Sequence, residues 1–349
     1  MGETPSAPRG FADVLARLAP DLALVESAMR EQLGSPSRLV ALLGAHVLTS
    51  GGKRMRPALL LLAAELCGYT GPRRIQLAAA IELVHTATLL HDDVVDFSAL
   101  RRGQPSAQAL WGNRRAVLAG DFLYARCSSL IVEDGNPDIL WIFANAIRCM
   151  AEGELLQLEH SYDPSVTEAH YLAVIERKSA TLLSAACEIG AIPGGVTRSE
   201  RRKLAEFGHE LGIAFQLRDD ALDYAAGEDA LGKPRYTDIR EGKVTLPLLL
   251  ALKRCAPAER EAIGSVLKKA AGLAELELAG AQGGEGSGRE ALDLAPALEL
   301  VARYRGVEDA VRRAEQHAAR AAAAIAPFPA SPAKEDLLAA VDYTVAREH

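Results

Sequence analysis

Two apolar stretches of this sequence each end in the same cluster of acidic residues. The first covers residues 81–103 (IELVHTATLLHDDVVDFSALRRG) and the second residues 215–224 (FQLRDDALDY). Both contain the spacing Asp-Asp-x-x-Asp, formed by Asp92, Asp93 and Asp96 and by Asp219, Asp220 and Asp223. Residues four apart lie on one face of a helix, where like charges repel unless a cation neutralises them. Hard divalent cations suit such oxygen ligands, and Mg²⁺ is usually bound by one or two carboxylates together with phosphate oxygens.

Basic residues accompany the acidic clusters in the sequence. Arg101 and Arg102 follow the first cluster directly and suit a phosphate group held by its metal. Residues 49–57 read TSGGKRMRP, where Lys53 and Arg56 adjoin two glycines that can expose backbone amides. Taken alone, this stretch is typical of a linker between helices. Because it accompanies two clusters of metal-binding type, we interpret it as a second anion pocket.

Lys178 lies within an otherwise apolar stretch that predicts a helix over residues 167–190. A lysine in such a helix is usually a surface residue whose ammonium group reaches solvent. A protein that binds a diphosphate through its acidic clusters needs further cations, so we interpret Lys178 as a diphosphate ligand.

The composition favours an all-α fold. The chain has 349 residues, 49% of them hydrophobic but only 5% aromatic, and alanine and leucine predominate. We predict one domain over residues 1–349, built from roughly a dozen helices with the acidic clusters at one end. Residues 1–10 are predicted to form a flexible tail, and residues 280–288 (GAQGGEGSG) a flexible internal loop.

Charge, cysteine content and hydropathy exclude several classes of protein. The net charge of −7 argues against a nucleic-acid partner. The five cysteines are scattered without CxxC spacing, as is typical of reduced thiols in a cytoplasmic protein. The polar start of the chain lacks the apolar segment of a secretory signal, and no run of about 18 apolar residues predicts a transmembrane span. We therefore expect a cytoplasmic location.

Taken together, the motifs resemble those of the trans-isoprenyl diphosphate synthases, also called polyprenyl synthetases. The stretches GGKRMRP, HTATLLHDDVVD, LRRG, WGN, GDFL, FQLRDDALDY and EGKVTLP match the family pattern in order, and the likeness spans residues 40–349. HTATLLHDDVVD and LRRG are most similar to the long-chain branch (octaprenyl, decaprenyl and solanesyl type) that makes quinone side chains. The resemblance implies a helical bundle of isoprenoid-synthase type around a central apolar cavity, and a homodimer.

The resemblance also implies roles for individual residues. The six clustered aspartates would hold Mg²⁺, up to three ions per active site, with Asp92, Asp96 and Asp219 as the expected direct ligands. These aspartates and Lys178 are the expected catalytic residues. The residues expected to contact the allylic diphosphate are Arg101, Lys178, Ser179, Gln216, Lys233 and Lys243. The residues expected to bind isopentenyl diphosphate are Lys53, Arg56, His85 and Arg102.

The reaction implied by the resemblance is head-to-tail condensation of isopentenyl diphosphate with an allylic prenyl diphosphate, which gives an all-trans polyprenyl diphosphate and pyrophosphate. Metal and cations would stabilise the departing diphosphate, and an apolar cavity would keep water from the carbocation. Ala87 and Thr88 are small residues one turn before the first cluster, where relatives with short products often carry a bulky aromatic residue. One helical turn matches about one prenyl unit, so we predict a product of about C30–C50, with contact to a membrane surface during its release.

Three other interpretations share part of this pattern. A geranylgeranyl or farnesyl diphosphate synthase would carry the same motifs but make a shorter product. A class I terpene cyclase would normally lack the second aspartate cluster and the GGKRMRP pocket, and would consume no isopentenyl diphosphate. A non-catalytic subunit of a heteromeric synthase would tend to lose aspartates or basic residues that this chain keeps.

Overall fold

The computed structural model describes residues 10–49, 52–101, 103–225, 236–278 and 292–347. The predicted tail, apart from Gly10, and the predicted loop at 280–288 lie outside these ranges. Two predicted ligands, Arg102 and Lys233, also lie outside the described residues.

The described residues are almost entirely helical, which confirms the predicted all-α class. The α-helices are α1 (Phe11–Gln32), α2 (Arg38–Thr49), α3 (Met55–Leu66), α4 (Arg73–Val95), α5 (Ala107–Trp111), α6 (Asn113–Asp134), α7 (Pro137–Glu159), α8 (Glu168–Ile175), α9 (Thr181–Ala191), α10 (Arg198–Ala225), α11 (Thr237–Arg240), α12 (Leu246–Leu252), α13 (Pro257–Leu278), α14 (Ala295–Arg303), α15 (Gly306–Ile325) and α16 (Pro332–Ala346). A π-helical segment (Glu176–Ala180) joins α8 to α9, and a 3₁₀ turn (Ile192–Gly194) follows α9.

One small sheet was not predicted from the sequence. Strands β1 (Leu100–Arg101) and β2 (Gln104–Pro105) pair in antiparallel register, with Arg101 opposite Gln104. Gly103 has φ of 75°, a backbone conformation that glycine adopts without strain, so the chain can reverse here. The two-residue strands are too short to produce a recognisable alternation of apolar and polar residues.

Local sequence explains where several helices begin. Asn136 accepts hydrogen bonds from the backbone amides of Asp138 (2.9 Å) and Ile139 (3.2 Å), and Pro137 occupies the first turn of α7. Ser331 caps α16 in the same way, accepting from the amide of Lys334 at 3.3 Å. These side chains satisfy amides that the helix itself leaves without a partner.

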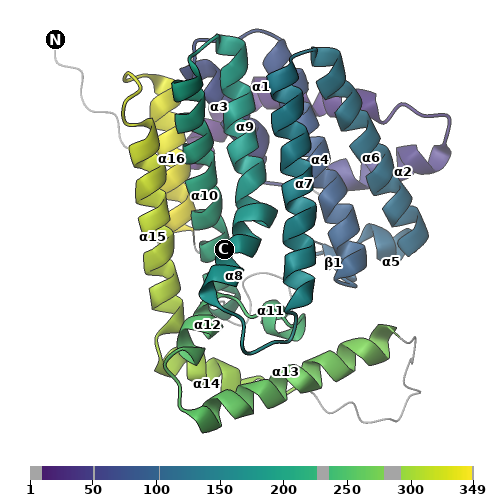
Figure 1. Ribbon diagram of the computed structural model, residues 1–349. Helices are drawn as coiled ribbons and strands as arrows, with labels where there is room; N and C mark the ends of the chain where they lie inside the picture. The colour runs from purple at the N-terminus through teal and green to yellow at the C-terminus, as the bar shows by residue number, and fades with distance from the viewer. Residues whose placement is uncertain (1–9, 50–51, 102, 226–235, 279–291, 348–349) are drawn as a thin grey trace.

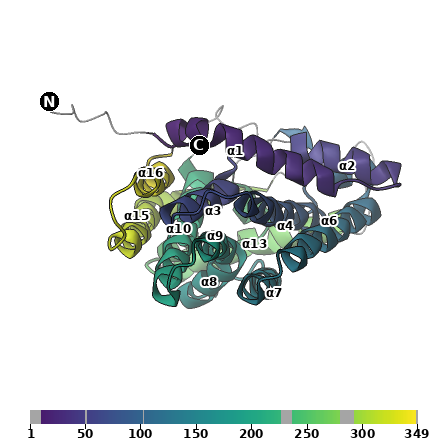
Figure 2. The ribbon, with the colours of Figure 1, turned by 90° about the horizontal axis from the view of Figure 1, so that it is seen from above.

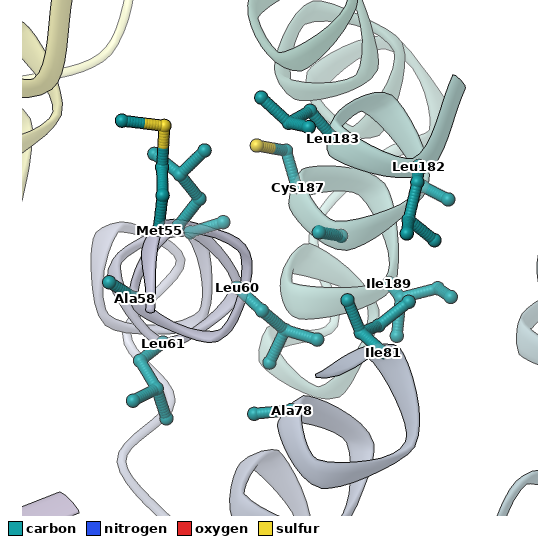
Figure 3. Packing of buried hydrophobic residues seen from close by; sticks show 14 of the residues in the cluster. Met55, Ala58, Leu60, Leu61, Ala78, Ile81, Leu182, Leu183, Cys187 and Ile189 are labelled. Atoms are coloured by element: carbon teal, nitrogen blue, oxygen red, sulfur yellow. The ribbon is translucent and has the colours of Figure 1, made fainter. Parts of the chain in front are cut away.

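The core is built around α3, α4 and α9. Seen from above, α1 and α2 lie on one side of α3 and α4, whereas α7 and α9 lie on the other (Figure 2). Helix α3 is buried on all sides over residues 57–64, an apolar run expected for a central helix. Leu60, Ile81 and Ile189 from these three helices interdigitate in the core (Figure 3). The helices that carry the acidic clusters are therefore held by extensive apolar packing.

Both acidic helix ends lie at the same end of the bundle. Strand β1 follows α4, and Figure 1 places it toward the lower end of the long helices, where α8, α11 and α12 also lie. A second apolar cluster contains buried residues of α8, α10 and α12 and supports this end of the molecule. None of the described helices is long and apolar enough to cross a membrane.

Candidate active site

The first acidic cluster lies at the C-terminal end of α4. Asp93 is buried, with 4% of its surface exposed, and its Oδ1 accepts a hydrogen bond from Arg101 Nε at 2.8 Å. Asp92 and Asp96 are half-buried, and Asp96 Oδ2 lies 3.0 Å from the ammonium group of Lys243. The middle aspartate is thus held by β1, whereas its two neighbours border the solvent-accessible side.

The charges at this helix end are in unfavourable proximity. Burial, together with the charges of Glu154 and Asp96, raises the pKa of Asp92 to about 7. Burial also raises the pKa of Asp93, although the guanidinium of Arg101 opposes that effect. A cation that binds beside such a carboxylate stabilises its ionised form.

The second acidic cluster lies near the end of α10 and is held mainly by hydrogen bonds. Asp220 is 4% exposed and accepts from Tyr171 Oη at 2.5 Å and from Gln216 Nε2 at 2.8 Å. The two carboxylate oxygens of Asp223 each accept from a backbone amide, those of Thr237 and Asp238, at 3.2 Å. The start of α11 is therefore fixed against the end of α10.

Asp219 is held by a residue from the last described part of the chain. Its Oδ1 accepts a hydrogen bond from Arg347 Nη2 at 2.5 Å, and the same nitrogen donates to the carbonyl of Phe215 at 2.8 Å. The guanidinium carbon of Arg347 also lies 3.8 Å from the centre of the Phe215 ring, a cation–π contact. The backbone carbonyl of Arg347 in turn accepts two hydrogen bonds from Arg218, at 2.8 and 3.1 Å.

Lys243 connects the first acidic cluster to the segment that follows α11. Its ammonium group pairs with Asp96 at 3.0 Å and with Glu241 at 2.6 Å, while its backbone amide donates to the carbonyl of Asp238 at 2.7 Å. Burial lowers the pKa of Lys243, but the charges of Asp96 and Glu241 outweigh burial and raise it. Asp238, in contrast, has a pKa well above its ordinary range because of burial and the charges of Asp220 and Asp223. One short loop thus contacts the end of α4 and the end of α10.

The donor set fits a hard divalent cation. Burial, together with the charges of Glu154 and Asp96, raises the pKa of Asp92 although Lys178 and Arg101 oppose the shift, so added positive charge is favourable. Among the residues that the structure describes, no three histidine, cysteine or acidic side chains converge as ligands of one ion. Mg²⁺ does not require such a cage, because it retains waters and takes most of its remaining ligands from phosphate oxygens.

Lys178 and Ser179 lie in the π-helical segment beside the second cluster. The ammonium group of Lys178 forms an ion pair with Glu154 of α7. The hydroxyl of Ser179 donates to Gln216 Oε1 at 2.7 Å, which connects this segment to α10. The sequence predicted an uninterrupted helix here, and π-helical turns are found preferentially at functional sites.

The remaining predicted ligands lie on α3, α4 and the segment before α3. Lys53 is exposed, with its ammonium nitrogen 5.3 Å from the centre of the Tyr343 ring, and Arg56 and His85 are half-buried. Arg54, between the two expected ligands, pairs instead with Glu82 at 3.0 Å and Glu26 at 3.3 Å. Whether these residues bind isopentenyl diphosphate stays a prediction.

The two residues expected to control product length differ in their surroundings. Ala87 is fully buried in the apolar core. Thr88 is half-buried. Its hydroxyl donates to the carbonyl of His85 at 2.7 Å, so the hydrogen of this hydroxyl is already bonded within the helix. Their role in product length stays a prediction.

Sequence reasoning missed three residues at the site. Glu154 had a recognisable signal, since it interrupts the apolar pattern of α7 and is now seen paired with Lys178. Tyr171 had none, because a tyrosine in a helix is normally a core residue. Arg347 had none either, because its contact with Asp219 spans 128 positions in the sequence.

Comparison with known proteins agrees with this geometry. A family profile described as Polyprenyl synthetase matches residues 38–278. The octaprenyl diphosphate synthase of Escherichia coli (strain K12) is 40% identical over 330 residues, which cover 95% of this chain and 97% of that protein.

Solved structures give the same result. A polyprenyl synthase from Caulobacter crescentus CB15, complexed with calcium and isoprenyl diphosphate, has a TM-score of 0.87 and 39% identity, covering 99% of this chain and 100% of that chain. A decaprenyl diphosphate synthase from Rhodobacter capsulatus has a TM-score of 0.86 and 39% identity, covering 97% of this chain and 99% of that chain. The family match, the relatives and the paired aspartate clusters lead to one conclusion: the chain belongs to the polyprenyl synthetase family.

Proposed function

We propose that the protein condenses isopentenyl diphosphate with an allylic prenyl diphosphate and releases pyrophosphate, giving an all-trans polyprenyl diphosphate. The observation that carries this proposal is the segment 237–243, which contacts both acidic clusters. Lys243 pairs with Asp96, and the amides of Thr237 and Asp238 donate to Asp223. The names of its relatives, octaprenyl and decaprenyl diphosphate synthase, favour a long-chain product.

The site residues divide the work between binding and ionisation. Asp92, Asp96 and Asp219 are the proposed direct ligands of Mg²⁺, up to three ions per site, and bound Mg²⁺ supplies positive charge that stabilises the departing diphosphate. The Caulobacter crescentus structure holds calcium with isoprenyl diphosphate, which supports divalent-metal chemistry. Arg101, Lys178 and Lys243 pair with Asp93, Glu154 and Asp96, and each cation can exchange its carboxylate partner for the diphosphate when it binds.

The product is proposed to be about C30–C50, because Ala87 and Thr88 on α4 are small residues about one turn before Asp92. Phenylalanine at position 87 should shorten the products by one or more prenyl units, as measured by chromatography of the dephosphorylated products. Overpacking alone costs about 1–3 kcal/mol of stability. The matched control is Ala340→Phe, which overpacks a fully buried position of α16 and should leave product length unchanged. An unaltered product distribution in Ala87→Phe contradicts this assignment.

The protein is also proposed to act as a homodimer, through the outer face of α6 and α7. Exposed positions on α7 recur with heptad spacing, at Trp141, Ala144, Arg148, Ala151, Leu155 and Leu158. Trp141 is 69% exposed, and on α6 Leu118 and Val132 are 59% and 61% exposed. Contiguous exposed apolar residues of this kind favour a protein partner. Trp141→Glu should therefore shift the mass measured by light scattering from dimer to monomer, and an unshifted dimer excludes this face.

The decisive experiment incubates the pure protein with Mg²⁺, labelled isopentenyl diphosphate and C10, C15 or C20 allylic primers. Incorporation of label into polyprenyl products supports the proposal, and the product size separates a long-chain enzyme from a geranylgeranyl or farnesyl diphosphate synthase. Turnover of the primer without incorporation indicates a terpene cyclase. Absence of any turnover indicates a non-catalytic subunit.

A further inference from the structure

We infer that Tyr171 is a positioning residue that couples diphosphate binding to metal binding, acting through Asp220, Gln216 and Ser179. The inference rests on the proposed function and deepens it. It assigns a role to a tyrosine that belongs to neither acidic cluster.

The first step is the environment of Asp220. Both of its carboxylate oxygens accept hydrogen bonds from protein groups, Oδ2 from Tyr171 and Oδ1 from Gln216. Tyr171 and Asp220 are 5% and 4% exposed, so these contacts are shielded from water. A hydrogen bond to a charged, buried acceptor is stronger than one in solvent. Asp220 is therefore an internal anchor of α10, and its neighbours Asp219 and Asp223 remain the groups at the surface of the site.

The second step is the orientation of Gln216. A carboxylate can only accept, so the amide nitrogen of Gln216 must face Asp220 and its carbonyl oxygen must face away. That oxygen accepts from the hydroxyl of Ser179 at 2.7 Å. The four side chains thus form one connected series of hydrogen bonds that meets at Asp220. Tyr171 donates directly to this carboxylate, and Ser179 donates to Gln216, which donates to the same carboxylate.

The third step is the path of the backbone. Tyr171 lies on α8 and Ser179 in the π-helical segment that continues it, so one helical run contacts α10 at two points. Residues eight apart on a regular α-helix are offset by about 80° around the axis. The wider π-helical turn reduces this offset and lets both side chains face α10. Lys178 is adjacent to Ser179, and its position therefore depends on the same two contacts.

These contacts make the diphosphate side and the metal side of the site mechanically dependent on each other. A diphosphate held by Lys178 and Ser179 alters the hydrogen bond from Ser179 to Gln216. Gln216 and Tyr171 both donate to Asp220, so the change reaches the second acidic cluster. Removing the Tyr171 hydroxyl should leave Asp220 held only at Oδ1, by Gln216, and so loosen the turn of α10 that carries the adjacent ligand Asp219. Each ligand should then bind less tightly in the presence of the other, since coupling between two sites is reciprocal.

The test measures binding of pyrophosphate to the full-length protein by calorimetry, at several Mg²⁺ concentrations and without turnover. In Tyr171→Phe, we expect Mg²⁺-dependent pyrophosphate binding to weaken roughly 10-fold and half-saturation to require more Mg²⁺. Ser179→Ala should show a similar loss. The double variant should lose less than the product of the two single losses, because both changes break one series.

Tyr304→Phe is the matched control, because Tyr304 Oη also donates to a carboxylate, Glu259 Oε2, at 2.8 Å. It should leave Mg²⁺-dependent binding unchanged in the same assay. Wild-type binding within twofold in Tyr171→Phe, or strictly multiplicative losses in the double variant, overturns the inference alone. If the wild-type protein itself fails to bind pyrophosphate with Mg²⁺, the proposed function and the inference fall together.

Discussion

The two acidic clusters have the same sequence spacing but are held in different ways. At the end of α4, the partners are cations, with Arg101 on Asp93 and Lys243 on Asp96. At the end of α10, two of the three aspartates accept from neutral donors, the Tyr171 hydroxyl and Gln216 amide for Asp220 and two backbone amides for Asp223. Asp219 also has a cation, Arg347, as a partner.

The difference indicates a division of labour. A neutral donor fixes the position of a carboxylate but leaves its charge in place, whereas a cation also neutralises it. The cations of the first cluster, Arg101 of β1 and Lys243 after α11, lie outside the long helices and can turn toward a diphosphate. The donors of the second cluster come from packed helices and the start of α11, so that cluster acts as the rigid side of the site.

The largest effect is expected from Asp92→Ala, which tests whether the first cluster carries the ionisation step. Loss of one preorganised electrostatic contribution to a transition state costs about 10²–10³ in rate. We expect kcat/KM for prenyl transfer to fall by at least that factor. The control is Asp342→Ala, which removes an exposed aspartate of α16 and should leave kcat/KM within twofold. Retention of more than a tenth of the activity in Asp92→Ala contradicts the proposed role.

The sequence predicted the positions of both clusters because a fixed spacing on an apolar helix determines which side chains share a face. Through the family resemblance it also assigned Arg101 and Lys243 to the allylic diphosphate, and that assignment stays a prediction. It did not predict which partner each aspartate takes. The contacts of Asp219 with Arg347 and of Asp220 with Tyr171 span 128 and 49 positions, and such contacts depend on how helices pack. The π-helical segment was missed for a related reason, since one extra residue in a turn leaves the apolar pattern almost unchanged.

The next effect concerns the loop that joins the clusters. Gly242 has φ of 75°, and a Cβ there would lie 2.5 Å from the Tyr162 ring. Gly242→Ala should therefore displace Lys243 and cost about 1–3 kcal/mol of stability, with roughly a tenfold loss of kcat/KM. Gly272→Ala in α13 is the control, since a Cβ meets nothing within 4 Å and alanine favours a helix. Chemical denaturation and steady-state assays measure both effects. Wild-type kcat/KM in Gly242→Ala would mean that the position of Lys243 does not affect the reaction.

Stability as a function of pH compares the clusters without substrate. The pKa values of Asp92 and Asp220 are raised from 3.8 to about 7, chiefly by burial. Between these values the folded protein binds more protons than the unfolded chain, so stability falls as pH rises from about 4 to about 7. Metal-free protein should thus have a lower Tm at pH 8 than at pH 5, and Mg²⁺ should raise Tm more at pH 8.

Asp92→Asn and Asp220→Asn assign that pH dependence to one cluster or the other. Asparagine carries no charge at either pH, so each variant should have a smaller difference in Tm between pH 5 and pH 8 than the wild type. Asp92→Asn should also reduce the effect of Mg²⁺ at pH 8 more than Asp220→Asn does, because Asp220 is turned toward Tyr171 and Gln216 and acts on the metal only through its neighbour Asp219. Differential scanning fluorimetry with EDTA or Mg²⁺ measures these changes. If both variants keep the wild-type difference in Tm between pH 5 and pH 8, the raised pKa values belong to groups other than Asp92 and Asp220.

The smallest effect is expected from exchanging arginine for lysine at one residue of each cluster. Arg347 uses its guanidinium to reach Asp219, the Phe215 carbonyl and the Phe215 ring at once, and its side chain is 4% exposed. A lysine ammonium is a point charge that cannot satisfy all three, so Arg347→Lys should cost about 1 kcal/mol of stability and raise the Mg²⁺ requirement a few-fold. Arg101→Lys should instead raise KM for the allylic substrate, because Arg101 is free to exchange Asp93 for a diphosphate. If both variants change the same parameter, either KM for the allylic substrate or the Mg²⁺ requirement, the two clusters are not functionally distinct. The proposed division, in which the first cluster gives its cations to the diphosphate and the second stays rigid, is then wrong.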